Sequence, residues 1–182
     1  MAEVASTVNE VLLIRYLLNT EKDKKLKKYL LSYLLEMIRT TLFRQTQFAE
    51  FEQFAHESVE KGEPLTKENL SAKYLELNKK YYGKAVESDG NIQYEWARIP
   101  HFYRAFYVYK YATGIISALA IADRILTEGQ VAVDDYFEFL SSGGKDSPVE
   151  LLKIAGVDLT DKKPFESAFS VFKDTLDQFK SL

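Results

Sequence analysis

Cysteine is absent from the 182-residue sequence, and histidine occurs only twice. Without cysteine the chain can form no disulfide, no thiol nucleophile and no zinc site built on thiolates. Proline and glycine are scarce, with 4 and 8 residues, so little interrupts long regular elements. A strong charge of one sign is missing too, because 24 basic and 27 acidic residues leave a net charge of −3. This balance argues against binding to nucleic acid or to an anionic membrane surface.

Long apolar runs are equally lacking. No run approaches the ~20 apolar residues that cross a bilayer, and the opening residues MAEVASTVNE have neither the basic nor the apolar region of a signal peptide. We therefore expect a soluble, cytoplasmic protein with no membrane segment. The 46% of hydrophobic and 14% of aromatic residues indicate that the chain folds around a core of its own.

Apolar residues recur at helical spacing along most of the chain, and glycine, proline or a capping residue marks most of the breaks. No segment alternates apolar and polar residues as a strand does. The pattern predicts helices over residues 4–18, 23–60, 66–83, 103–126, 130–141, 147–155 and 164–180. We expect the longest of them to bend near Thr40 and Thr41 or near Thr46. The expected fold is all-α, with residues 1–182 forming a single helical domain.

Residues 84–100 form the longest irregular stretch. Loops of this length inside compact domains are often functional. Gly83 and Gly90 are candidate hinges. The sequence Asp89-Gly90-Asn91 either turns the chain or contacts a bound peptide.

The sequence His56-Glu57-Ser58-Val59-Glu60 partly matches HExxH, the motif of helical zinc sites. Its fifth residue is glutamate where the motif has histidine. One interpretation is a solvated helix end, because a lysine and a glycine follow at once. The other is a metal site built on His56, Glu57 and Glu60.

The second histidine stands in a dense aromatic stretch. His101 is followed by Tyr103, Tyr107, Tyr109 and Tyr111. A helix over these residues would place Tyr103, Tyr107 and Tyr111 on one face, at spacing i, i+4 and i+8. Buried hydroxyls need partners, so this face either meets polar protein groups in a core or lines a wet cleft. In such a cleft His101 would relay a proton or bind an oxyanion.

Several motifs, in order along the chain, resemble those of the oligoendopeptidase F family of thimet-oligopeptidase-like zinc peptidases. They are AEVASTVNE (2–10), FRQTQFAEFE (43–52), GEPLT (62–66), YYG (81–83) and WARIPHFY (96–103). The resemblance covers essentially the whole chain and places it in the C-terminal part of the catalytic domain. It implies an all-helical, zincin-like domain, which agrees with the helical periodicity.

The resemblance also implies a set of site residues. In this family two histidines of HExxH and a later glutamate hold zinc. Glu3 matches that glutamate, and Glu10 would orient a ligand as a neighbouring carboxylate. His101 matches an oxyanion-binding histidine, which is assisted by one or two of the tyrosines that follow it. We favour Tyr103 and Tyr107, because they are nearest to the histidine in the sequence.

The sequence contains no HExxH, which the resemblance places upstream of residue 1. With one zinc ligand of three and no general base, the chain by itself is expected to bind little zinc and to cleave no peptides. The intact enzyme would hydrolyse short peptides. Cleft surface left uncovered in this chain would favour self-association. The alternative is a non-catalytic helical interaction module that reuses the scaffold.

Overall fold

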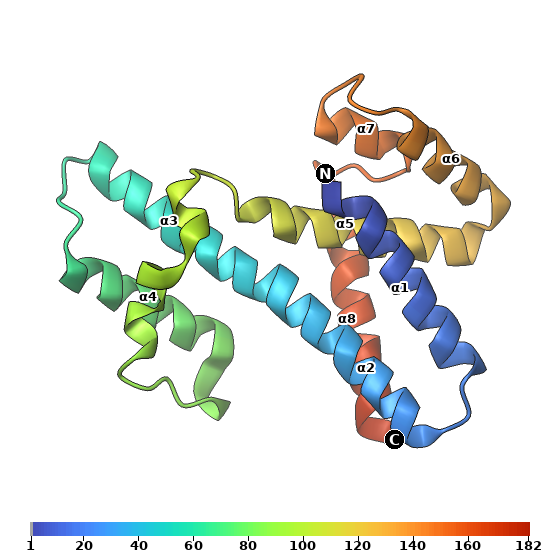
Figure 1. Ribbon diagram of the computed structural model, residues 1–182, viewed down its shortest axis with the longest axis horizontal. Helices are drawn as coiled ribbons and strands as arrows, with labels where there is room; N and C mark the ends of the chain where they lie inside the picture. Colours follow the sequence, from blue (N-terminus) through green and yellow to red (C-terminus); the bar gives the residue numbers. More distant parts are fainter. Residues whose placement is uncertain (1) are drawn as a thin grey trace. The chain divides into compact units, whose positions relative to one another are not determined.

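The computed structural model describes residues 2–182, with side chains from Glu3 onward. Within that range the chain is helical and contains no strand, which confirms the all-α prediction. The α-helices are α1 (Ala2–Thr20), α2 (Lys24–Ile38), α3 (Arg44–Glu60), α4 (Lys67–Tyr82), α5 (Tyr109–Glu128), α6 (Gln130–Ser141), α7 (Pro148–Ile154) and α8 (Lys163–Ser181), as Figure 1 shows. Shorter elements are the π-helical segment η1 (Arg39–Phe43) and the 3-10 turns η2 (Gly83–Ala85), η3 (Ile92–Arg98) and η4 (Pro100–Tyr103).

The chain packs into two compact units. The first unit is Met1–Leu42 with Thr113–Leu182, and the second unit is Phe43–Ala112. The helical run α2–η1–α3 passes from the first unit to the second, and α5 begins in the second and continues in the first. The expectation of a single domain over residues 1–182 stays a prediction.

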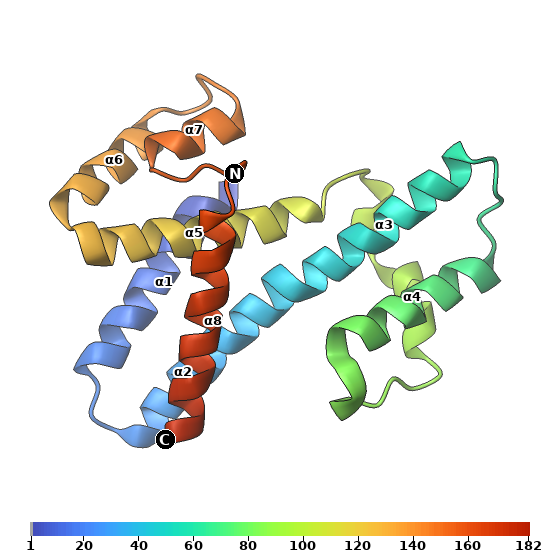
Figure 2. The same ribbon diagram turned by 180° about the vertical axis from the view of Figure 1, so that it is seen from behind.

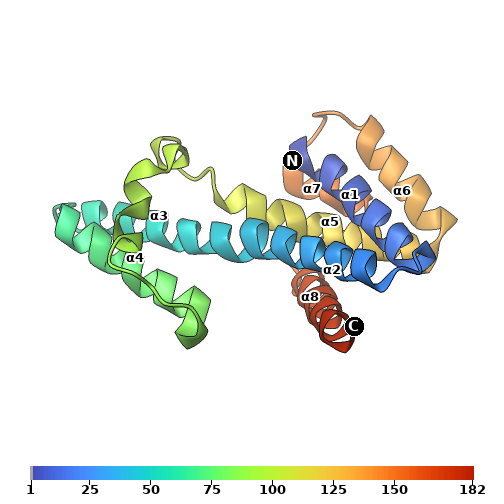
Figure 3. The same cartoon turned by 60° about the horizontal axis from the view of Figure 1, so that its bottom comes forward.

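The core of the first unit lies among α1, α5, α6 and α7. Its buried residues are Val4, Val8, Ala118, Ala120, Ile121, Tyr136, Phe139, Leu151, Leu152, Ala155 and Val157. Helix α2 packs against α1 and α8 (Figures 2 and 3), and the ammonium group of Lys28 lies 5.1 Å from the ring centre of Phe179. Among residues 2–182, no helix has both the length and the apolar character required to span a bilayer.

The ends of α3 and α7 share one type of glycine cap. In both, the glycine N–H donates to the carbonyl three residues back at 2.9 Å, and the next N–H donates to the carbonyl five residues back, at 2.9 Å after Gly62 and 3.0 Å after Gly156. Gly62 has φ 78° and Gly156 has φ 76°, the left-handed region that this cap requires. These caps confirm the helix ends predicted from the two glycines.

The cap at Gly156 also lies against a side chain. Arg124 of α5 donates from Nη1 to the Ala155 carbonyl at 2.7 Å. Its Nη2 donates to Glu128 at 2.7 Å and to Asp135 of α6 at 3.0 Å. A Cβ atom at Gly156 would lie 1.8 Å from Arg124 Nη1. Only glycine therefore leaves room for the guanidinium group beneath the end of α7.

The core of the second unit lies between α3, α4 and the segment that follows α4. Its buried residues are Phe48, Phe51, Tyr74, Leu77, Ile99 and Val108. The predicted long helix over 23–60 is continuous, but η1 replaces α-helical by π-helical bonding at Thr40 and Thr41. The irregularity thus lies at Thr40 and Thr41, one of the two expected positions, and not at Thr46. π-Helical bonding is rare and occurs mostly as such short segments within α-helices.

Helix α4 begins with a reciprocal cap. Thr66 Oγ1 accepts from the Asn69 N–H at 3.2 Å, and Asn69 Oδ1 accepts from the Thr66 N–H at 2.9 Å. We expect Thr66→Ala to lower the free energy of unfolding by about 1 kcal/mol, because it leaves an N–H of the first turn without this acceptor. Urea unfolding measures the change. Thr66→Ser, which keeps the hydroxyl, is the control, and equal losses in both variants would contradict the capping role.

The prediction of a helix over 103–126 is wrong at its start. Helix α5 begins at Tyr109, and the preceding residues form η4 and an irregular turn over 104–108. The physical reason lies at Phe106, whose φ of 55° is incompatible with a right-handed helix. The other predicted helices lie within three residues of those observed.

Candidate functional site

The predicted oxyanion-binding residues, His101, Tyr103 and Tyr107, lie in the segment between α4 and α5, which contains three 3-10 turns. Asp89 Oδ1 accepts from the N–H groups of Asn91 and Ile92, each at 2.9 Å. This geometry confirms that Asp89-Gly90-Asn91 turns the chain. Farther along, Trp96 Nε1 donates to Ser71 of α4 at 3.2 Å. This hydrogen bond fixes the segment to α4 five residues before His101.

A buried carboxylate fixes η3 to the helices beside it. Glu95 Oε2 accepts from the Tyr74 hydroxyl at 2.6 Å, and Oε1 accepts from Arg44 and Arg98. Burial, together with the hydrogen bond to Glu95, raises the pKa of Tyr74 far above its usual value. The Tyr74 phenol therefore stays protonated and acts as a donor. This network belongs to the scaffold that carries η4.

Three rings form a compact cluster around His101. The ring of Tyr107 stacks on that of His101 at a centroid distance of 5.6 Å and an interplanar angle of 22°. Tyr111 meets both rings edge-on, at 5.8 Å from His101 and 5.5 Å from Tyr107. Its hydroxyl lies 3.3 Å from His101 Nε2, within hydrogen-bonding distance. The first turn of α5 thus supplies a hydroxyl that orients the imidazole.

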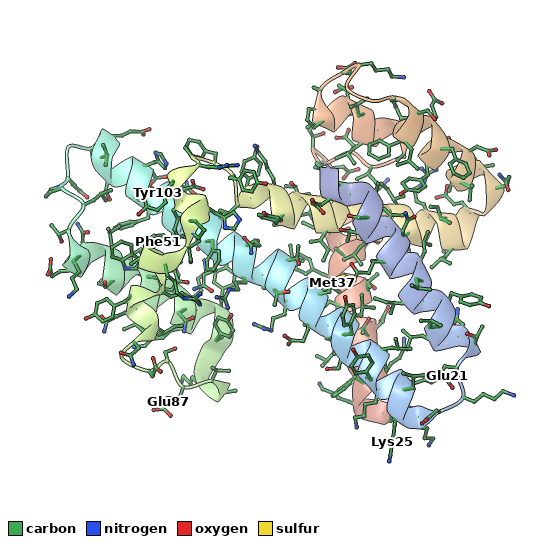
Figure 4. The ribbon with its side chains drawn as sticks, viewed as in Figure 1. Glu21, Lys25, Met37, Phe51, Glu87 and Tyr103 are labelled. Carbon is green, nitrogen blue, oxygen red and sulfur yellow. The ribbon has the colours of Figure 1, made fainter. Side chains whose placement is uncertain are left out.

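The tyrosine ladder expected on one helical face is not present. Tyr103, labelled in Figure 4, ends η4 and is 89% exposed, outside the three-ring cluster. Tyr109, the first residue of α5, is 47% exposed. Because the helix starts at Tyr109, the tyrosines that accompany His101 are Tyr107 and Tyr111. Catalytic roles for Tyr103 and Tyr107 stay predictions.

A pocket of about 240 Å³ opens beside the cluster. Its lining consists of Pro100, His101, Arg104 and Tyr107. One face of the imidazole is covered by Tyr107, while His101 remains partly exposed toward the pocket. The arrangement offers a cation, an imidazole and a phenol to a bound group. Such donors suit a carbonyl oxygen that acquires negative charge.

The turn that brings Tyr107 to His101 has a feature that the sequence did not indicate. Phe106 has φ 55°, a left-handed conformation that costs a residue with a side chain about 1–2 kcal/mol. Its N–H donates to Oε1 of Glu52 on α3 at 2.8 Å. Its ring stacks on His56, also on α3, at a centroid distance of 4.6 Å. Glu52 is 5% exposed. The only signal in the sequence was the spacing, which places this acid one helical turn after Phe48, on an apolar face of the helix.

The structure contradicts a metal site on His56, Glu57 and Glu60. Within residues 2–182 no three histidine, cysteine, aspartate or glutamate side chains gather closely enough to hold a metal ion. Glu57 instead accepts from Gln53 at 2.7 Å and lies 3.7 Å from the Lys61 ammonium group. The partial HExxH match is the end of an amphipathic helix.

Glu3 and Glu10 lie on α1, in the first unit, whereas His101 lies in the second. Glu3 is exposed in the first turn, and its Oε2 accepts from Ser6 Oγ at 3.3 Å. Glu10 accepts from the Tyr33 hydroxyl of α2 at 2.5 Å, and this hydrogen bond raises the pKa of Tyr33. Glu3 thus presents an accessible carboxylate, whereas Glu10 already has a protein partner.

Comparison with known proteins decides the family. The sequence model of the family described as "Peptidase family M3" matches residues 1–171. The chain belongs to peptidase family M3. Its relatives include the oligopeptidase PepF of Bacillus subtilis (strain 168), 50% identical over the whole chain, and the plasmid oligoendopeptidase F of Lactococcus lactis subsp. cremoris, 44% identical over the whole chain. These confirm the resemblance to oligoendopeptidase F.

A solved structure agrees with the M3 assignment. The crystal structure of oligoendopeptidase-F from Enterococcus faecium superposes with a TM-score of 0.95 at 49% identity and covers 99% of this chain. The chain spans only part of these proteins, namely 27% of the Bacillus protein, 30% of the Lactococcus protein and 34% of the Enterococcus chain. The M3 sequence described here therefore corresponds to a segment of each relative.

Proposed function

We propose that this M3 chain is the C-terminal part of the catalytic domain of a zinc-dependent oligopeptidase that hydrolyses short peptides in the cytoplasm. The observation that carries the proposal is the cluster of His101, Tyr107 and Tyr111 beside an open pocket. The names of the relatives, oligopeptidase and oligoendopeptidase F, support the substrate class.

His101 is proposed to hydrogen-bond the oxygen of the scissile carbonyl as negative charge develops on it. The Tyr111 hydroxyl orients the imidazole through its contact with Nε2, and Tyr107 lines the pocket beside it. Donors aimed at charge that exists only in the transition state accelerate the reaction rather than tighten substrate binding. Tyr103 is the second candidate, because its side chain is exposed and therefore accessible to a substrate.

The residues described here do not form a zinc site by themselves, since no group of three ligands occurs among residues 2–182. Glu3 fits the role of one ligand, because its carboxylate is accessible, and Glu10 would support it from the same helix. A zinc ion completed by histidines outside this chain would supply a Lewis acid and an activated water. The 182 residues alone are therefore proposed to be inactive.

Removing the Glu3 carboxylate tests the metal assignment in the complete peptidase. We expect Glu3→Gln to weaken zinc binding by more than about tenfold and to lower peptide cleavage in parallel, because even partners of zinc ligands contribute that much. Zinc titration and cleavage of a short fluorogenic peptide measure the two effects. Glu68→Gln, an exposed change in the first turn of α4, is the control.

Two results would refute parts of this proposal. Unchanged zinc affinity in Glu3→Gln would remove Glu3 from the metal site. A complete protein that binds its peptides but cleaves none of them, with and without added zinc, would favour the non-catalytic interaction module instead.

A further inference from the structure

We propose that Glu52 is a positioning residue that holds the turn over residues 104–108 and thereby keeps the ring of Tyr107 against His101. The contacts that carry this inference all lie in the second unit. Its kinetic consequence rests on the proposed function, whereas the structural role of Glu52 does not.

The two ends of the turn are fixed by packing. On one side the ring of Phe102 lies 5.8 Å from Phe48 and 5.3 Å from Phe51. On the other side Val108 is 1% exposed within the same core. The residues between these ends, 103–106, are exposed. Apolar burial therefore does not determine the conformation of the middle of the turn.

The middle of the turn is held from α3. Phe106 has a left-handed backbone although its side chain is 53% exposed, so burial of its ring does not account for that conformation. The buried Glu52 carboxylate accepts its N–H at 2.8 Å, and His56, one helical turn after Glu52, stacks on its ring. An unusual backbone conformation persists where its surroundings determine it more than once. At Phe106 both a hydrogen bond and a ring contact hold the left-handed conformation.

The conformation of Phe106 decides where Tyr107 points. Tyr107 is the next residue, and its ring stacks on His101 at 5.6 Å. If Phe106 returned to negative φ, the following peptide and the Tyr107 side chain would rotate away from this position. Glu52 thus acts on the cluster through the backbone of the turn.

The direct test is hydrogen exchange of the unmodified chain, followed by NMR. If Glu52 accepts the Phe106 N–H, that amide should exchange at least about tenfold more slowly than the neighbouring exposed amide of Ala105. Equal protection factors for the two amides, that is, equal rates after correction for intrinsic exchange, would overturn the proposal. This measurement needs no variant, so it decides the question even if substitutions at Glu52 prevent folding.

Substitution gives the second test. Glu52→Ala should raise tryptic cleavage after Arg104 by about tenfold and shift the His101 imidazole resonance, because the stacked Tyr107 ring moves. Glu52→Gln, which keeps an oxygen acceptor, should restore most of the wild-type behaviour, and Glu60→Ala, an exposed acid on the same helix, should match the wild type. Wild-type cleavage and resonances in Glu52→Ala would refute the positioning role.

Kinetics of the complete peptidase then separate this inference from the proposed function. Glu52→Ala should lower kcat about tenfold with little change in KM, and Glu52→Gln should recover it. If His101→Ala leaves kcat unchanged while the Phe106 amide is protected, the oxyanion role fails and the turn assignment stands. If the Phe106 amide is unprotected, the turn assignment fails whatever His101 does.

Discussion

In the complete peptidase, His101→Ala is expected to lower kcat by about 10²–10³-fold, while KM changes by less than about threefold. The reason is that the proposed hydrogen bond strengthens only as charge develops on the carbonyl oxygen, so its loss raises the barrier without weakening the bound substrate. Steady-state cleavage of one short peptide, measured over a range of concentrations, gives both constants.

Tyrosine variants identify which phenol assists the histidine. Tyr107→Phe should lower kcat about tenfold, because Tyr107 lines the pocket beside His101. Tyr103→Phe tests the other candidate, whose exposed side chain lies outside the cluster. Tyr94→Phe removes a phenol from η3, away from the pocket lining, and serves as the control. An unchanged kcat in His101→Ala would contradict the oxyanion role itself.

Gly156→Ala is expected to lower the free energy of unfolding by about 3 kcal/mol. A residue with a side chain at this left-handed position costs about 1–2 kcal/mol. The added methyl group would also lie 1.8 Å from Arg124 Nη1, so the guanidinium group must leave the Ala155 carbonyl. Loss of such a hydrogen bond from a partly buried carbonyl adds about 1–2 kcal/mol. Urea unfolding followed by circular dichroism measures the sum.

Gly62→Ala is the matched control for this substitution. Gly62 caps α3 with the same hydrogen bonds and nearly the same φ, yet nothing lies within 4 Å of the place where its Cβ would be. It should therefore show only the backbone cost, about 1–2 kcal/mol. The difference between the two variants isolates the contact with Arg124. Equal losses would mean that the side chain of Arg124 moves aside without cost.

Local signals predicted much of this fold. Gly62, Gly83 and Gly156 ended helices as expected, and Thr66 with Asn69 opened α4, because caps depend on residues within one turn of the helix end. The start of α5 was not predictable in this way. It depends on Phe106, whose left-handed backbone N–H donates to a carboxylate 54 positions earlier in the chain. Periodicity within one segment carries no information about such a partner.

The candidate site was predictable in part for the same reason. The density of aromatic residues after His101 pointed to the segment that contains the three-ring cluster, and the resemblance to oligoendopeptidase F pointed to the right family. The choice among tyrosines required the helix start, since one misplaced turn exchanges the residues that share a face. With α5 beginning at Tyr109, Tyr111 joins His101 and Tyr103 does not.

The position of the single tryptophan has a consequence for how the chain can be studied. Trp96, bound to Ser71, belongs to the second unit, so its fluorescence is an intrinsic optical reporter of that half of the fold alone. The far-ultraviolet circular dichroism signal, by contrast, is the sum of contributions from the helices of both units. Recording the two signals on one sample during denaturation shows whether the halves melt as one cooperative block or in succession.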